Sequence, residues 1–320
     1  MATLIGIDVG GTNLRLGVVK YNDAFIEETQ QAQPQLIEEK RFQTDFSTLC
    51  KSHEPKQAWQ SILNAIAAAV ESMQLKHPEI SAVGIGFPGF IDPKTQAISQ
   101  SPNLPGLSNV DLSNDLSQII ELPVITENDA LAAAYGEYIS RATQINSLIY
   151  LGLGTGVGGG LILNGQPFQG QHGVAMEVGH ITVLPNGRLC GCGNHGCMEQ
   201  YASASGIAIS YFETNNQYLK AHEIADLARQ GDQNAIAAYH LAGKTLAQAL
   251  AHLLKVIDVT DVVIGGGVSA GWALMELVFA QQLDEDLIPA LRGKVNVTIS
   301  QLGDQAGIIG AAMLASQKLQ

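Results

Sequence analysis

The sequence has few charges, few cysteines and fewer basic than acidic residues. Of its 320 residues, 15% are charged, with 17 Lys and Arg against 30 Asp and Glu, so the formal net charge is −13. A polyanion would meet net repulsion, and no basic run offsets it, so we expect no nucleic acid among the partners. No apolar stretch approaches the roughly 20 residues that span a bilayer, so we expect no membrane association.

Features of a secretion signal are also missing. The N-terminal "MATLIGIDVGG" enters a strand pattern at once, without the charged segment, apolar segment and cleavage site of a signal peptide. We therefore predict a cytoplasmic globular protein, with enough residues for two domains. Cytosolic thiols stay reduced, so the four cysteines are not expected to form a structural disulfide.

Three of the four cysteines lie within eight positions, in "CGCGNHGC". Cys190 and Cys192 are separated by one residue, which is a poor spacing for an unstrained disulfide, and the segment lacks the Cys-x-x-Cys of a redox pair. Three thiolates and one imidazole on a glycine-rich turn suit tetrahedral zinc instead. The predicted ligands are His180, Cys190, Cys192 and Cys197, with His195 as an alternative to His180. Cys50 stands alone, and we expect it to be inert.

Two segments share a pattern of strand, glycine turn and strand. They are "TLIGIDVGGTNLRLGVV" and "SLIYLGLGTGVGGGLIL", whose turns begin at Gly10 and Gly154. Helix and strand patterns follow each of them, which predicts two related α/β halves. We expect an N-terminal domain over residues 1–120, joined by a C-terminal helix at about 305–320. The second domain would cover residues 121–304.

Glycine turns of this kind can direct several backbone N–H groups at one anion, such as a nucleotide phosphate. One turn alone is more often a plain hairpin, but three in one chain favour a nucleotide site. The candidate nucleotide-binding residues are Asp8, Gly10, Gly11, Thr12 and Asn13 in the first turn, Gly154, Thr155 and Gly156 in the second, and Gly265, Gly266 and Gly267 in the third. Asp8, at a strand end, is also a candidate magnesium ligand.

Two other motif matches do not fit their context. Gly154, Gly156 and Gly159 match the dinucleotide fingerprint, which requires a following helix, whereas "GLILNG" predicts a strand. The Gly-Lys-Thr at 243–245 resembles the end of a P-loop, but position 238 is Ala and the segment has a helical pattern. We therefore predict neither a dinucleotide site nor a P-loop.

Carboxylate and amide side chains stand at several predicted turns. In "LPVITENDALAAAYGE", Asn128 or Asp129 suits a helix N-cap, but a carboxylate at a strand end is also where a general base for phosphoryl transfer would stand. Asn103 lies on the turn "SPNLPG", where plain turn chemistry would explain it equally well. Glu177 and Glu199 bracket the predicted zinc loop, although exposed glutamates are usually solvated surface.

Together these motifs resemble the ROK family of sugar kinases and sugar-sensing repressors, over nearly the whole chain. The matching segments are "DVGGTN" from Asp8, "END" from Glu127, "GTGVGGG" from Gly154, "EVGH" from Glu177, "CGCGNHGCMEQYAS" from Cys190 and "GGGVS" from Gly265. The resemblance implies two actin-like, ribonuclease-H-like α/β domains with a cleft between them. It also implies structural zinc on His180 and the three clustered cysteines.

The resemblance further implies an ATP-dependent hexose kinase that requires magnesium. Asp129 would accept the proton of a sugar hydroxyl, most readily on C6, as its oxygen attacks the γ-phosphorus of ATP. The residues expected to contact the sugar are Gly89, Asn103, Asn128, Asp129, Glu177, His180 and Glu199. Repressors of the family carry a winged helix ahead of the first phosphate turn, for which no room is expected before Asp8.

Glucose is the expected substrate, because the glutamates and asparagines of the sugar pocket are all present. N-acetylmannosamine, N-acetylglucosamine and fructose remain open, since Met176 stands where many members have glycine just before the first pocket glutamate. A sugar sensor without activity is the competing class. The resemblance also suggests a homo-oligomer, with a dimer as the first choice.

Overall fold

The computed structural model describes residues 2–10, 13–22, 33–143 and 145–317. The chain divides into two compact units. The first comprises the residues up to Ser147, Gly160–Ala175 and the residues from Asp304 onward, and the second comprises Leu148–Gly159 and Met176–Gly303. None of the helices in the described ranges combines the length and apolar character that crossing a bilayer requires.

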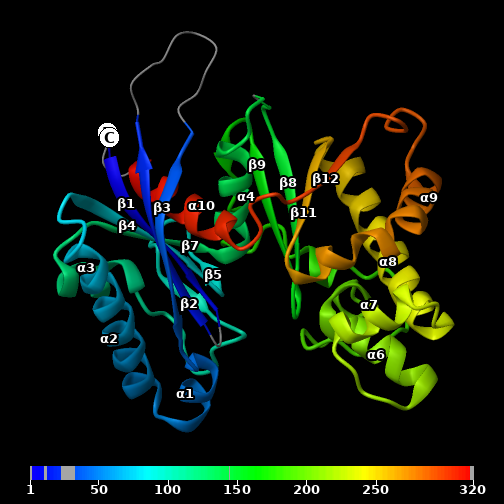
Figure 1. Cartoon of the computed structure of the whole chain (residues 1–320), viewed down its shortest axis with the longest axis horizontal. Helices are drawn as coiled ribbons and strands as arrows, with labels where there is room; N and C mark the ends of the chain where they lie inside the picture. Colours follow the sequence, from blue (N-terminus) through cyan, green and yellow to red (C-terminus); the bar gives the residue numbers. More distant parts are fainter. Residues whose placement is uncertain (1, 11–12, 23–32, 144, 318–320) are drawn as a thin grey trace. The chain divides into compact units, whose positions relative to one another are not determined.

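The first unit is built on a five-stranded sheet (Figure 1). Its strand order is β3 (Gln35–Gln43), β2 (Asn13–Tyr21), β1 (Ala2–Val9), β4 (Ile80–Phe87) and β7 (Val124–Asn128). The first three strands are antiparallel neighbours, whereas β4 and β7 run parallel to β1. The carboxyl ends of β1, β4 and β7 therefore meet at one edge, where Asp8 pairs with Gly86 and Gly86 with Glu127.

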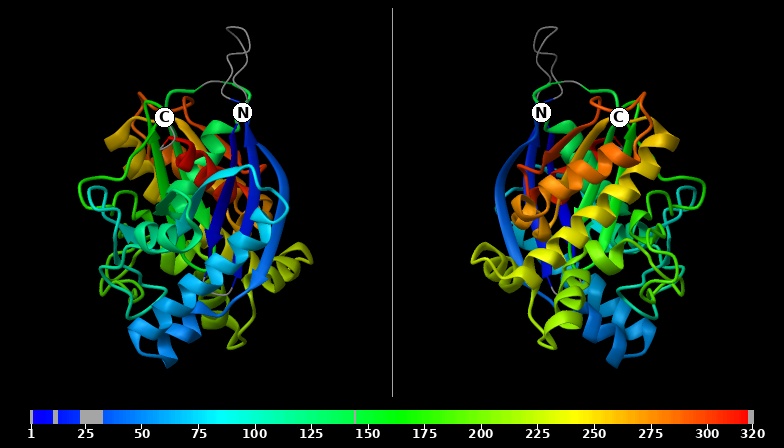
Figure 2. Two further views of the ribbon diagram at one scale, coloured as in Figure 1. Left: turned by 90° about the vertical axis from the view of Figure 1, so that its left-hand side faces the viewer. Right: turned by 90° about the vertical axis from the view of Figure 1, so that its right-hand side faces the viewer.

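Helices cover both faces of this sheet. One face carries α1 (Phe46–Ser52), α2 (Pro55–Gln74) and α3 (Leu112–Ile120), and the left view of Figure 2 shows α2 in front of the strands. Apolar residues of α2 recur at helical spacing and pack on alternate residues of β1 such as Ile5 and Ile7. Pro55 begins α2 at a position that needs no donor N–H.

The other face of the sheet carries α4 (Asp129–Ile139) and α10 (Gln305–Ser316). Backbone packing here is unusually close, because a Cβ at Gly6 would lie 1.8 Å from the Ile308 carbonyl oxygen and one at Gly84 would lie 1.7 Å from that of Ala311. Only glycine permits this approach. The small residues of α10 allow this close packing, and they are buried from Ala306 to Ala315.

A second sheet repeats the order of the first. It contains β10 (Gln166–Pro167), β9 (Val157–Leu163), β8 (Leu148–Leu153), β11 (Asp261–Gly265) and β12 (Asn296–Ile299). Its β11 and β12 run parallel to β8, as β4 and β7 run parallel to β1. The expected fold class, two α/β domains of actin-like topology, is confirmed by this repetition.

The helices of the second unit centre on the 25-residue α8 (Gln233–Ile257). It packs against α5 (Glu199–Ala202), α6 (Ala204–Asn215), α7 (Ala221–Arg229) and α9 (Glu276–Asp286). The right view of Figure 2 shows α8 and α9 in front of the strands. Gly243 and Thr245 lie within α8, and β9 follows the Gly154 turn, so both rejected motif matches are confirmed as helix and strand.

The division between the units differs from the boundary we expected near residue 120. Strand β7 hydrogen-bonds along β4, and α4 packs on α10, so residues 121–147 belong to the first unit. The chain also returns to that unit at Gly160–Ala175. Pairing between strands far apart in the sequence overrides the local pattern that suggested a boundary before β7.

Candidate active site and metal centre

The four predicted zinc ligands come together in the second unit. One ligand atom from each of His180, Cys190, Cys192 and Cys197 lies within 4.8 Å of the others. His180 Nδ1 lies 3.5 Å from Cys190 Sγ, and the Sγ atoms of Cys192 and Cys197 are 3.7 Å apart. Three thiols and one imidazole are the donor set of a structural zinc site. His195, the alternative ligand, is exposed and lies outside this group.

The loop that carries the thiols is folded by its own backbone. Thr182 and Cys197 form an isolated antiparallel β-bridge, and so do Leu189 and His195. The N–H of Cys190 donates to Asn194 O at 2.8 Å. Burial, and the neighbouring Cys192 and Cys190 thiols, raise the pKa of Cys197 to about 12. Three thiolates at such short distances repel one another unless a cation compensates them. The residues therefore fit a divalent zinc ion.

The four zinc ligands, His180, Cys190, Cys192 and Cys197, are called the cage below. His180 connects this cage to a carboxylate. The 3-10 turn Val178–His180 directs Nδ1 of the ring to the thiols and places Nε2 3.7 Å from Glu177 Oε2. An imidazole that offers one nitrogen to a metal while the other faces a carboxylate is a common arrangement around zinc. Glu177 and His180 are thus positioned by the same turn.

Glu199 lies against the second glycine turn. Its Oε2 accepts a hydrogen bond from the Val157 N–H at 2.9 Å, and a Cβ at Gly156 would lie 2.4 Å from the same oxygen. Gly156 therefore leaves space for this carboxylate. The sequence separates the proposed sugar ligand Glu199 from the proposed phosphate turn by more than 40 residues, but the fold brings the two into contact.

Two predicted glycine turns lie side by side at the ends of parallel strands. Gly152 in β8 pairs with Gly265 in β11, and Gly266, with φ of 80°, would place a Cβ 2.4 Å from Leu153 O. A Cβ at Gly267 would meet nothing within 4 Å. Thr155 is exposed, and its carbonyl accepts a hydrogen bond from Ser205 Oγ in the first turn of α6. Backbone at both turns is accessible to a phosphate.

The first unit holds two neighbouring carboxyl groups, Asp8 at the end of β1 and Asp129 at the start of α4. Burial, and then the charge of Asp129, raise the pKa of Asp8 to about 7, although Arg15 opposes this. Burial also raises the pKa of Asp129, against the stabilising Ala130 N–H, which donates to Oδ1 at 2.8 Å. Two partly buried acids near each other favour binding of a proton or a cation.

Asn128 joins the start of α4 to two loops. Its Oδ1 accepts from the Leu131 N–H at 3.0 Å, so the cap predicted from the sequence is present. Its Nδ2 donates to Gly89 O at 3.1 Å. Gly89 in turn packs on the segment that leads to Asn103, since a Cβ at Gly89 would lie 2.8 Å from Gln100 O. Asn103 itself is exposed on this loop.

The first glycine turn is described only in part. Gly10 closes it by donating to Asn13 O at 2.8 Å, and Asn13 Oδ1 accepts from Arg41 Nε at 3.0 Å. Gly11 and Thr12, which we expected to contact phosphate, lie outside the described residues.

The predicted site residues are divided between the two units. The first unit contains Asp8, Gly89, Asn128 and Asp129, and the second contains the zinc ligands, Glu177, Glu199 and the remaining glycine turns.

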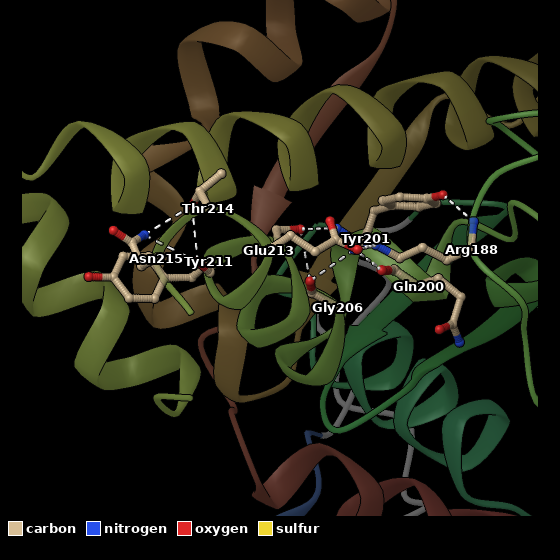
Figure 3. Close-up of polar contacts among 9 residues, drawn as sticks. Arg188, Gln200, Tyr201, Gly206, Tyr211, Glu213, Thr214 and Asn215 are labelled. Atoms are coloured by element: carbon tan, nitrogen blue, oxygen red, sulfur yellow. Dashed lines mark hydrogen bonds and ion pairs between the residues drawn. The ribbon is translucent and has the colours of Figure 1, made fainter. Parts of the chain in front are cut away.

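Arg188 is a supporting residue that the sequence analysis missed (Figure 3). Its guanidinium makes a bidentate contact with Glu213, at 3.1 and 2.6 Å, and also donates to Ser210 and to the carbonyls of Gln200 and Gly206. It lies 4.6 Å from the Tyr201 ring centroid, and the Tyr201 hydroxyl accepts from the Arg188 N–H at 2.8 Å. Arg188 therefore fixes the zinc loop to α5, which begins with Glu199.

A signal for Arg188 was present in the sequence. It is one of only 17 basic residues and stands within the glycine-rich zinc loop. Its main partner, Glu213, lies 25 residues away on α6, so no local pattern could identify the contact.

Comparisons with known proteins identify the family that this sequence matches. A model of the ROK family matches residues 4–318. A glucokinase from Streptomyces coelicolor is 31% identical and an N-acetyl-D-glucosamine kinase from Salmonella newport is 34% identical. These alignments cover 99% and 97% of this chain, respectively, and 98% of each relative.

Among solved structures, the chain is similar to a ROK family glucokinase from Streptomyces griseus in complex with glucose and AMPPNP. The two are 32% identical, with a TM-score of 0.80, and the match covers 99% of this chain and 100% of the other. The similarity therefore extends over both units of the fold.

We expect substitution of Cys192 by Ser to remove zinc from the purified protein. Changes around a metal ligand already weaken binding about 10–100-fold, so loss of a ligand should exceed about 100-fold. Elemental analysis should show about one zinc per chain in the wild type and close to none in the variant. Cys50→Ser, outside the cage, is the control and should keep its zinc. Equal zinc content in both variants would show that the cage is not the metal site.

Substitution of Arg188 by Lys should destabilise the second unit. A lysine keeps the charge but cannot reproduce the bidentate contact with Glu213 or reach both carbonyl groups, so we expect a loss of about 2–3 kcal/mol in unfolding free energy. Urea denaturation measures this loss. The matched control Arg229→Lys alters an exposed pair with Asp226 and should change stability by less than about 0.5 kcal/mol. Similar losses for the two variants would contradict a special role for Arg188.

Proposed function

The chain belongs to the ROK family, and on that premise we propose that it is an ATP-dependent sugar kinase with Asp129 as the general base. The environment of Asp129 carries the proposal. Its carboxyl group is held by the Ala130 N–H at the start of α4, and burial raises its pKa. A positioned carboxylate with a raised pKa is a better proton acceptor for a sugar hydroxyl than an exposed one.

In the proposed reaction, Asp129 accepts the proton of a hexose hydroxyl as the oxygen attacks the γ-phosphorus of ATP. A new oxygen–phosphorus bond forms, the bond to the β-phosphate oxygen breaks, and ADP leaves. The glycine turns at Gly154–Gly156 and Gly265–Gly267 offer backbone N–H groups to the phosphates. Asp8 would hold magnesium, which supplies compensation for the charge on the phosphates.

Sugar recognition would depend on fixed polar groups. Asn128 is held by its cap and by Gly89, Glu199 by the Val157 N–H, and the His180 ring by the cage and Glu177. A side chain already held by protein partners loses little conformational entropy when it binds a hydroxyl. We propose that these residues, with Asn103, contact the sugar and that zinc stabilises the loop between the two glutamates.

Glucose is the first candidate substrate, since glucokinases are among the relatives over the whole chain. N-acetylglucosamine is the second, because a kinase for that sugar is 34% identical. Met176 leaves the choice between these sugars open, because it stands directly before the pocket residue Glu177, where many family members have glycine. Its φ of 65° is a conformation that favours glycine. We also propose a cytoplasmic location and a homodimer.

The substrate is tested by ATP-dependent ADP release in the presence of magnesium. Glucose, mannose, fructose, N-acetylglucosamine and N-acetylmannosamine should be compared at equal concentrations. We expect one sugar to exceed the others in kcat/KM, with glucose first. Absence of stimulation by every sugar, from folded protein that contains zinc, would overturn the proposed function.

Substitution of Asp129 by Asn should remove catalysis and leave sugar binding measurable. A general base contributes about 10²–10⁴-fold, so we expect kcat to fall at least about 100-fold. Isothermal titration with the preferred sugar should give a Kd within about fivefold of the wild type, since Asn retains a hydrogen-bonding group. Asp258→Asn, at an exposed helix end, is the control and should keep full activity. Full turnover by Asp129→Asn would exclude the base role.

The magnesium requirement should increase below pH 7. Asp8 must lose its proton to bind a cation, and its pKa is raised to about 7, so its ionised fraction falls about tenfold between pH 8 and pH 6. The apparent activation constant for Mg²⁺ should therefore be about tenfold weaker at pH 6 than at pH 8. Magnesium titrations at fixed ATP measure this change. A constant that does not change with pH would remove Asp8 from the metal site.

A further inference from the structure

Glu127 is a buried carboxyl group that the proposed reaction does not use. It is the last residue but one of β7, two residues before Asp129, and its exposure is 5%. Burial of an acid is costly unless partners compensate it. Among the described residues, no Lys, Arg or His forms an ion pair with Glu127. Burial accordingly raises its pKa to about 7.

The partners of Glu127 are two hydrogen-bond donors. Oε1 accepts from the N–H of Asn128 at 2.8 Å, and Oε2 accepts from Nε2 of Gln169 at 2.5 Å. A carboxylate offers an acceptor to each donor, whereas a glutamine would offer one acceptor and one NH₂ group. The two donors are therefore matched to a carboxylate. An amide of the same shape keeps its contact with the Asn128 N–H, but it keeps the Gln169 contact only if the Gln169 amide turns over to present its oxygen.

One of these donors belongs to the peptide group between Glu127 and Asn128. The same Asn128 caps α4 through the Leu131 N–H and donates to Gly89 O. Asp129, the next residue, is held by the Ala130 N–H. Glu127 thus fixes the peptide plane at the point where β7 becomes α4, and the direction of the Asp129 side chain depends on that plane.

The other donor belongs to a loop that is itself ordered. Gln169 follows β10, next to Phe168, whose N–H donates to Leu161 O at 2.8 Å. The carbonyl of Gln169 accepts from the Ala175 N–H at 3.3 Å. The Gln169 side chain therefore extends from a closed loop, and its amide connects residues 168–175 to the strand that leads into Asp129.

From these contacts we propose that Glu127 is a positioning residue, which sets the orientation of the catalytic Asp129 by bridging the Asn128 N–H and the Gln169 amide. The proposal rests on the proposed kinase function. Gln169 acts with Glu127 as the second half of this bridge. Neither residue need touch the sugar or ATP.

A side-chain exchange tests the bridge. In Glu127→Gln, the bridge loses its negative charge and the Gln169 amide must turn over to keep its contact. We expect kcat to fall about 10–100-fold, because small displacements of a catalytic group have effects of this size. KM for ATP should stay within about threefold of the wild type, as the nucleotide turns are unchanged. Gln169→Glu places two carboxyl groups in contact and should also lower kcat.

The double variant Glu127→Gln/Gln169→Glu restores a donor opposite an acceptor. Its glutamine accepts from the Asn128 N–H and donates to the new glutamate, so we expect kcat to return to within about threefold of the wild type. Glu71→Gln and Gln166→Glu, both exposed, are the matched controls and should change nothing. Thermal midpoints of all variants should be measured in parallel.

Rescue in the double variant, with a midpoint of Glu127→Gln close to the wild type, would support positioning. Wild-type kcat in Glu127→Gln would overturn it. A loss of kcat in Glu127→Gln that the double variant does not restore would also overturn it. So would a loss that appears only at temperatures at which the variant has begun to unfold. A wild type that phosphorylates no sugar would instead overturn the proposed function itself.

Discussion

Burial of carboxyl groups at one edge of the first sheet is the constraint on which the rest of that unit depends. Asp8, Glu127 and Asp129 all have raised pKa values, because full or partial burial disfavours their charged forms. The free-energy cost is offset locally, by backbone N–H groups at the start of α4, the Gln169 amide and the Arg15 charge. An edge of this kind is unfavourable as a structural element alone, but it suits a site that must bind protons and cations.

The second unit meets a different requirement, which is to hold a long loop with little regular structure. The cage and Arg188 act at neighbouring positions, since Arg188 is two residues from Cys190 and its charge is paired with Glu213 on α6. Backbone contacts within the loop supply the remaining order. As a result Glu177, His180 and Glu199 are fixed by short-range contacts within one unit.

The sequence was sufficient to predict features that depend on local chemistry. The zinc ligands are a cluster of soft donors, the Asn128 cap stands directly before its helix, and the repeated strand–turn–strand pattern indicated two similar sheets. Features that depend on pairing over long distances were not predictable. The boundary was misplaced because β7 pairs with β4, and the Glu127–Gln169 and Arg188–Glu213 contacts join residues 42 and 25 positions apart.

The close packing of α10 on Gly6 and Gly84 also affects how the protein can be made. Strands β1, β4 and β7 leave the ribosome early, yet one face of their sheet is covered by α10, which follows the whole second unit in the sequence. Until that helix emerges, the nascent sheet exposes an apolar, glycine-lined surface, which is a target for chaperones and for aggregation. The unit whose strands are synthesised first therefore cannot finish folding until α10 has been made.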